Sequence, residues 1–170
     1  MGPTLSGGFL WRRRHLGLDV PERKRATAVN PTIEKFGYPA TLVHELEHWV
    51  ILLRPAQVTL GSLVLAAKSD AMAYGQLPRE TFAQQADAVA LIERALQQFA
   101  RYERINYLML MMVDPNVHFH VIPRYSGPRT WNGSEFPDVG WPGPPQLGTA
   151  VPLSEEQIGA LAAELSSNFR

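Results

Sequence analysis

The segment Asn116-Val117-His118-Phe119-His120-Val121-Ile122 alternates polar and apolar side chains over its first six residues. Side chains two residues apart on a β-strand point to the same face of the sheet. Asn116, His118 and His120 would therefore line one face, and the apolar residues between them would line the other. We expect a strand that buries its apolar face in the core and turns its imidazole-bearing face toward a site.

Two imidazoles on one face of a strand are compatible with several roles. An unperturbed histidine has a pKa of about 6.5, so most of it is neutral and nucleophilic at pH 7. A second imidazole beside a nucleophile can hold a proton or pass it to a departing oxygen. The spacing of His118 and His120 alone leaves three interpretations open: a structural or surface pair, a metal site, and covalent catalysis.

The sequence before this strand predicts a strand pair followed by a long helix. Residues 49–53 are an apolar run of strand length that ends at Arg54-Pro55, and residues 61–66 are a second such run. The short connection between them indicates an antiparallel pair. Residues 68–78 are expected to form a loop with one helical turn at most. Residues 79–104 show the apolar stripe of one amphipathic helix.

The sequence after the long helix predicts a second strand pair and then a loop. Residues 106–113 are expected to form a strand whose methionines, Met109, Met111 and Met112, lie in the core. Pro123 is expected to end the histidine-bearing strand. Residues 127–148 are rich in Gly, Pro and Trp, which favours an ordered loop without regular structure.

The last predicted element is a helix that begins at Ser154. Ser154 is the expected N-cap, and Gln157 three residues later completes a capping box. The full order of elements predicts an α+β fold with about five antiparallel strands, one long helix and a carboxy-terminal helix.

The composition of the 170-residue chain fits one globular domain with a sizeable core. Hydrophobic residues make up 45% of it, and 16 basic residues balance 16 acidic ones for a formal net charge of +0. The chain lacks the surplus of basic residues that is typical of proteins that bind nucleic acid. No apolar run reaches the ~18 residues of a membrane span. The absence of cysteine excludes disulfides and thiol catalysis and fits a cytoplasmic protein.

The first 29 residues differ from the rest, so we divide the chain into a leader, residues 1–29, and a domain, residues 30–170. The leader contains two basic clusters, residues 12–14 and 23–25, and little apolar periodicity. We expect a flexible leader that takes no part in the fold. Two alternatives stay open: an organelle-targeting peptide, and a biological start near Val29.

The segment from Asn116 to Arg124, NVHFHVIPR, closely resembles the signature of the histidine-triad (HIT) family, in which three histidines alternate with apolar residues. The resemblance extends to the early hairpin, residues 54–65, and to Trp141-Pro142-Gly143, where relatives carry a Trp-Pro loop. It covers roughly residues 31–147.

The resemblance implies a nucleotide hydrolase or transferase that needs no metal or cofactor. His118 matches the nucleophile, which attacks the α-phosphorus of a nucleoside phosphoramidate or dinucleoside polyphosphate and forms a nucleotidyl-histidine. His120 matches the residue that contacts the phosphate and assists the leaving group. A purine nucleotide is the implied substrate, and a homodimer is the implied assembly.

The first triad position departs from the family pattern, because it is Asn116 and not histidine. In relatives the backbone carbonyl of this residue accepts a hydrogen bond from Nδ1–H of the nucleophile, and an asparagine supplies the same carbonyl. Its amide can also donate to phosphate, but it cannot titrate near neutrality. We expect reduced activity that Asn116→His would raise.

The nucleoside pocket also departs from the family. The acid or amide that holds ribose in many relatives aligns with Arg54, which is either a phosphate contact or a surface charge before a turn proline. Arg124 is either a phosphate contact or a salt-bridged surface arginine. Trp131 and Trp141 either wall a nucleoside pocket, since bases stack on aromatic rings, or pack the proline-rich loop.

Three other functions compete with this interpretation. A nucleotide-binding protein with an incomplete triad would bind without turnover. A metal hydrolase would use His118, His120 and Asp114. The segment 44–48, His-Glu-Leu-Glu-His, matches the zinc-protease pattern, which requires both histidines on one helical face, whereas residues 49–53 favour a strand.

Overall fold

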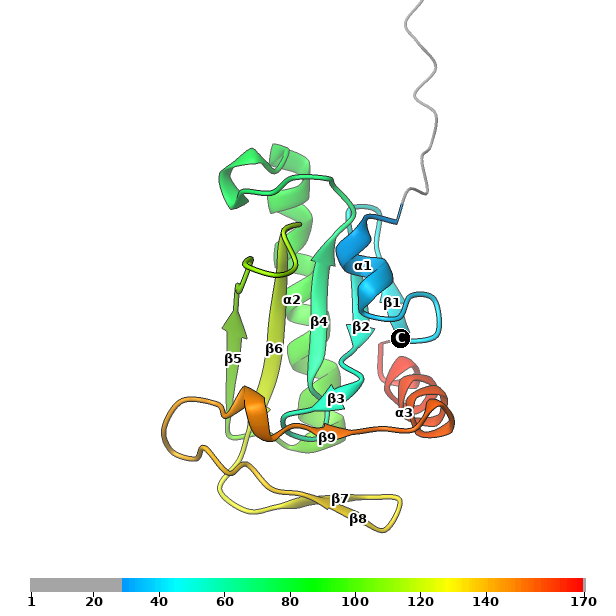
Figure 1. Ribbon diagram of the computed structural model, residues 1–170, viewed down its shortest axis with the longest axis vertical. Helices are drawn as coiled ribbons and strands as arrows, with labels where there is room; N and C mark the ends of the chain where they lie inside the picture. The colour runs from blue at the N-terminus through cyan, green and yellow to red at the C-terminus, as the bar shows by residue number, and fades with distance from the viewer. Residues whose placement is uncertain (1–28, 170) are drawn as a thin grey trace, which may run out of the picture.

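A five-stranded antiparallel sheet is the centre of the fold (Figure 1), in a computed structural model that describes residues 29–169. The strands lie in the order β1-β2-β4-β6-β5. They are β1 Leu42–Glu45, β2 Trp49–Leu53, β4 Leu63–Ala67, β5 Arg104–Leu108 and β6 His118–Arg124. The predicted α+β class with five antiparallel strands is confirmed. The predicted leader, residues 1–29, lies outside the described residues except for Val29.

Two short strand pairs lie outside the main sheet. They are β3 Ala56–Gln57 with β9 Val151–Pro152, and β7 Arg129–Trp131 with β8 Ser134–Phe136. Two single 3₁₀ turns, η1 Tyr74–Gln76 and η2 Leu147–Thr149, complete the loops. The one-turn helix expected within residues 68–78 is thereby confirmed.

Helices cover the two faces of the sheet unequally. The long helix α2, Arg79–Ala100, and the last helix α3, Glu155–Ser167, pack on one face (Figure 1). The short helix α1, Pro31–Lys35, lies on the opposite face. Ser154 caps α3 and Gln157 completes the capping box, as predicted. None of the helices within residues 29–169 is both long and apolar enough to cross a membrane.

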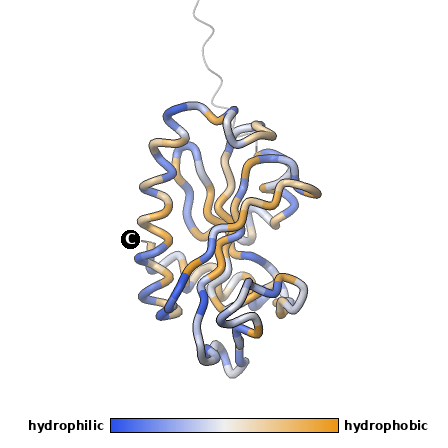
Figure 2. Tube along the Cα trace, turned by 90° about the vertical axis from the view of Figure 1, so that its left-hand side faces the viewer, coloured by the Kyte–Doolittle hydropathy of each residue, from blue (hydrophilic) through white to orange (hydrophobic). Residues whose placement is uncertain are grey.

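The main core lies between the sheet and α2. Trp49, Ile51 and Leu53 of β2 are fully buried there against Ile92 and Leu96 of α2. Hydrophobic and hydrophilic residues alternate along the long helix (Figure 2), and its buried residues include Ala88, Ile92 and Leu96. The opposite residues of β2 and β4 are also buried, because Ile33 of α1 covers them.

The long helix is shorter than predicted, and the next strand begins earlier. α2 ends at Ala100, because Arg101 adopts the left-handed conformation with φ 48°. The Arg129 side chain donates to the carbonyls of Ala100 and Arg101, which the helix end leaves unpaired. β5 therefore starts at Arg104.

Met109 and Met112, which follow β5, are not core residues, and the prediction was wrong for these two. β5 ends at Leu108, which pairs with His120, and the chain then leaves the sheet. Met109 is 40% exposed and Met112 is 91% exposed, whereas Met111 packs partly against the core. The hydrophobicity of this segment predicted a strand, but β6 begins only at His118, so residues 111–113 have no partner in β6.

Two further predictions about local structure were wrong. Pro123 lies inside β6 and does not end it; the β4 ladder stops at Val121, so the missing N–H leaves no partner unpaired on that side. Residues 127–148 contain the β7–β8 hairpin, whose turn residues Asn132 and Gly133 both have positive φ. An Asn-Gly pair is a strong hairpin signal, and it could have been read from the sequence.

Two glycines should respond in opposite ways to alanine. Gly61 has φ +89°, and an added Cβ would lie 3.1 Å from Leu96, whereas Gly159 lies exposed in α3 with nothing near its missing Cβ. We expect Gly61→Ala to lower the free energy of unfolding by about 1–2 kcal/mol. Gly159→Ala should raise it by about 0.5–1 kcal/mol. Urea unfolding followed by circular dichroism measures both, and a stabilised Gly61→Ala would contradict the turn geometry.

Candidate functional site

The two histidines of β6 lie side by side on the face of the sheet opposite α2. His118 pairs with Ala66 of β4 and is fully buried, and His120 pairs with Val64 and is 8% exposed. Their ring centroids are 5.2 Å apart and the ring planes lie at 82°. The alternation expected of this strand therefore places both imidazoles at one point.

The ring of His118 is held in one orientation by its own strand. Its Nδ1 lies 2.8 Å from the backbone carbonyl oxygen of Asn116, which can only accept a hydrogen bond. The proton of the neutral ring is therefore assigned to Nδ1, and the lone pair stays on Nε2. Nε2 is buried and has no hydrogen-bond partner. This is the geometry of a neutral imidazole whose nucleophilic nitrogen is free.

Phe36, which directly follows α1, packs against both imidazoles. Its ring centroid lies 5.5 Å from that of His118 and 5.6 Å from that of His120. This contact removes water from one side of the pair. Nothing in the histidine segment signalled Phe36, which reaches the site through the position of α1.

Burial keeps His120 neutral. Desolvation, together with the electrostatic influence of His118 and Arg54, lowers its pKa to about 4, whereas Asp114 acts in the opposite direction. Its Nδ1 is buried without a partner. At pH 7 His120 is therefore an uncharged donor or acceptor, and a negatively charged ligand at the pair would oppose the shift.

The side chain of Asn116 is already engaged within the protein. Its Oδ1 accepts a hydrogen bond from Thr32 Oγ1 at 3.0 Å, and its Nδ2 donates to the carbonyl of Asp70 at 3.3 Å. The backbone N–H of Asn116 donates to the same threonine hydroxyl. These contacts tie the start of β6 to α1 and leave one amide N–H for the expected phosphate contact.

Arg54 follows β2 and lies near enough to His120 to affect its charge. One Nη1–H donates to the carbonyl of Ala56, but Nε is buried without a partner. Desolvation lowers the pKa of Arg54 itself. Arg54 is thus a partly buried cation with an unpaired donor beside two imidazoles. This environment favours the phosphate-contact alternative for Arg54 over the surface-charge alternative.

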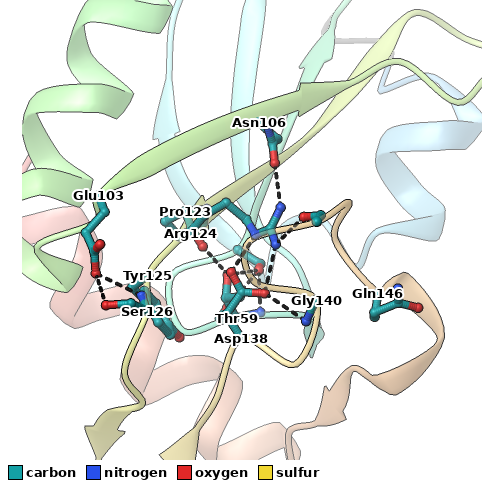
Figure 3. Close-up of polar contacts among 12 residues, drawn as sticks. Thr59, Glu103, Asn106, Pro123, Arg124, Tyr125, Ser126, Asp138, Gly140 and Gln146 are labelled. Atoms are coloured by element: carbon teal, nitrogen blue, oxygen red, sulfur yellow. Dashed lines mark hydrogen bonds and ion pairs between the residues drawn. The ribbon is translucent and has the colours of Figure 1, made fainter.

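Arg124 is buried and fully used to hold a loop (Figure 3). Its Nε and Nη2 donate to the Asp138 carboxylate at 2.6 and 3.0 Å, and Nη2 also donates to the carbonyl of Gly143. Nη1 donates to Asn106 Oδ1 on β5. The structure thus favours the salt-bridged alternative for Arg124, although the pair is buried and not on the surface.

The two tryptophans considered for a nucleoside pocket lie in different places. Trp141 lines a cavity of about 720 Å³ over β5, together with Leu108 and the prolines that follow it. Trp131 lies on β7, and its indole N–H donates to Glu164 of α3. Trp141 therefore stays a candidate contact, and Trp131 is not part of the site.

The alternatives that rest on metal ions lose their geometric basis. His44 is on β1, where it stacks on Phe169, and His48 precedes β2, so the two do not share a helical face. Asp114 forms an ion pair with Lys35 at 2.5 Å. Within residues 29–169 no three histidine or acidic side chains lie close enough together to hold a metal ion.

Several solved structures share this fold. A histidine-triad protein from Sinorhizobium meliloti superposes with a TM-score of 0.64 at 24% identity, over 82% of this chain and 95% of its own. One from Bradyrhizobium japonicum gives 0.64 at 18% identity, over 84% and 98%. A hypothetical histidine triad nucleotide-binding protein from Sulfolobus tokodaii gives 0.56 at 20%, over 76% and 83%.

No protein-family profile matches the chain, and no curated protein matches it in sequence. At these identities the structural likeness establishes the fold. The chain has the fold of histidine-triad proteins.

The lowered pKa of His120 predicts how stability depends on pH. The folded imidazole titrates near pH 4 and the unfolded one near its ordinary 6.5, so the unfolded chain binds more protons between these values. The free energy of unfolding should therefore fall as the pH drops from about 6.5 toward 4. His120→Gln should make this dependence shallower in urea unfolding, while His48→Gln serves as the control. An unchanged slope in His120→Gln would contradict the assignment.

Proposed function

We propose that this protein is a HIT-family nucleotide hydrolase or transferase with His118 as its nucleophile. The observation that carries the proposal is the 2.8 Å contact of His118 Nδ1 with the Asn116 carbonyl, which leaves Nε2 buried and free. A purine nucleotide is the substrate, either as a phosphoramidate or as a dinucleoside polyphosphate.

In the first step the lone pair of His118 Nε2 forms a bond to the α-phosphorus. The bond from phosphorus to the amine or phosphate leaving group breaks, and that group takes the electron pair and a proton from solvent. The Asn116 carbonyl accepts from the Nδ1–H of the resulting imidazolium and so stabilises its positive charge. Water then attacks the same phosphorus, the bond between phosphorus and Nε2 breaks, and the water gives a proton back to solvent, which releases the nucleoside monophosphate and neutral His118.

Arg54 and His120 complete the anion site in this proposal. The free Nε of Arg54 and the unpaired ring nitrogen of His120 are donors available to the phosphate oxygens. A neutral His120 can donate a hydrogen bond from its N–H to the leaving oxygen or nitrogen, and the proton that the leaving group takes comes from solvent. Trp141 contacts the substrate from the cavity over β5. Arg124 acts indirectly, because its hydrogen bond to Gly143 fixes the loop that forms the wall of that cavity.

The solved structures support nucleotide chemistry in a general way. The Sulfolobus tokodaii protein is described as nucleotide-binding, and it shares the fold that presents the histidine pair here. The second candidate function is a nucleotide-binding protein with little turnover. It is favoured by Asn116, because this side chain cannot titrate and is hydrogen-bonded to Thr32 and Asp70. An increase in turnover on Asn116→His would argue for a weakened enzyme.

Removal of the nucleophile should abolish turnover. With adenosine 5′-phosphoramidate or diadenosine tetraphosphate and a chelator present, the wild type should release AMP. His118→Ala should lower the rate by about 10³-fold or more, because it removes the nitrogen that forms the covalent intermediate. The matched control is His48→Gln, which changes an imidazole outside the site. Equal release by wild type and His118→Ala would rule out the covalent route.

We also propose that two chains pair through the β5 edge. β5 is an outer strand of the sheet, so one row of its backbone groups has no partner strand within residues 29–169. Large apolar side chains are exposed directly after it, including Leu110 at 44% and Met112 at 91%. Exposed apolar patches beside an open edge mark contact surfaces.

The double variant Leu110→Asp, Met112→Asp should therefore be a monomer. The wild type should sediment at twice the 19.0 kDa chain mass. Two carboxylates in an apolar interface are strongly unfavourable unless they are paired. Analytical ultracentrifugation measures the mass, and Met72→Asp, at another exposed methionine, is the comparison. A monomeric wild type would refute the dimer.

A further inference from the structure

One end of the cavity over β5 is Leu108, the residue that pairs with His120. Leu108, Asn106 and Arg104 alternate along β5 and so share the face that carries the histidines. Leu108 is the Cα partner of His120, and Arg104 is the partner of Arg124 at the other end of the strand. The cavity floor therefore runs along β5 from the residue beside His120.

The loop that walls this cavity is fixed in place. Arg124 binds Asp138 and the carbonyl of Gly143 from β6, and it binds Asn106 from β5 (Figure 3). Trp141 lies between the two loop contacts and is half-buried. A volume of about 720 Å³ lies within the range of about 300–1,000 Å³ that is typical of small-molecule sites.

The charges of the lining favour an anion. Arg124 is neutralised by Asp138, but Arg104 has no ion pair within the described residues, and its Nη1 donates to the neighbouring carbonyl of Glu103. The Glu103 carboxylate accepts from Ser126 instead. The described residues that line the cavity include no Asp or Glu. Arg104 and Arg129 both act on the single Glu103 carboxylate, so positive charge is in excess at Arg104, about 13 Å along the strand from Leu108.

We propose that this cavity binds the leaving group of the substrate and selects a large anionic one, with Arg104 and Trp141 as the specificity-determining residues. The inference rests on the proposed function, because it places the departing group beside His120. A leaving group with a flat ring stacks on Trp141, and its negative charge pairs with Arg104. Ammonia is too small to reach either residue, and a cationic amine is repelled by Arg104.

Two substrates that differ only in the leaving group test the selection. Diadenosine tetraphosphate releases a large anion, and adenosine 5′-phosphoramidate releases ammonia. The ratio of their kcat/KM values should favour the tetraphosphate in the wild type. Arg104→Gln should lower this ratio about tenfold through the loss of a charge-assisted contact, and Trp141→Ala should lower it by a similar factor through lost stacking.

Arg94→Gln is the matched control, because Arg94 is exposed on α2 behind the sheet, and its ratio should equal that of the wild type. Arg104→Glu should lower the ratio further than Arg104→Gln. An unchanged ratio in Arg104→Gln, whether both rates fall equally or neither falls, would overturn the proposal.

Failure of the proposed function has a different signature. If the wild type cleaves neither substrate, calorimetry with His118→Ala decides the inference by itself. Tighter binding of diadenosine tetraphosphate than of AMP, with the difference lost on an added Arg104→Gln change, supports the cavity. Equal affinities for the two ligands overturn it.

Discussion

One face of β6 packs against the core under α2, and the other face carries the histidine pair. Because side chains alternate along a strand, the two-residue period decides which side chain lies on which face. Val121 is buried against the core that α2 covers, while His118 and His120 face the other way. A shift of register by one residue would bury the imidazoles in that core and expose the apolar side chains. The burial of the apolar side chains of β6 therefore fixes where His118 and His120 lie. The packing of the long helix against these apolar side chains is thus part of the site's geometry.

The same region collects polar atoms that the protein leaves without partners. Among the described residues, Nε of Arg54, Nε2 of His118 and Nδ1 of His120 are buried and unpaired. Oδ1 of Asp114 also accepts no hydrogen bond, but it lies 2.5 Å from the Lys35 ammonium. Buried polar atoms without partners cost free energy, and native proteins keep few of them. Their presence at one place is the expected signature of a site that a polar ligand completes.

The fold was predictable because its main signals are local. The apolar run at residues 49–53, the stripe of α2 and the capping box at Ser154 each follow from spacing along the chain. The segment 109–113 misled this reasoning, because hydrophobicity alone does not tell whether a strand partner exists.

The site was predictable only in part. The strand pattern identified His118 and His120, and the resemblance implied the contact of His118 with the Asn116 carbonyl that the structure contains. Phe36 and Thr32 reach the site through α1, and Asp138 reaches Arg124 across a loop, so their roles depend on distant segments. No spacing rule connects such residues. The sequence likewise did not distinguish Arg54, whose Nε is unpaired, from Arg124, whose charge is neutralised by Asp138. Only the structure separates these two arginines.

The buried pair of Arg124 and Asp138 has an evolutionary consequence. Loss of either partner alone would leave an uncompensated charge in the interior, at a cost of about 3–5 kcal/mol, whereas loss of both together can be neutral. The two positions should therefore change together among related sequences, as a linked pair of a strand residue and a loop residue. Related sequences that lack both residues would also tolerate more changes in the loop that carries Trp141, because Arg124 no longer holds it. Covariation of the two positions would therefore identify the sequences in which the wall of the cavity differs.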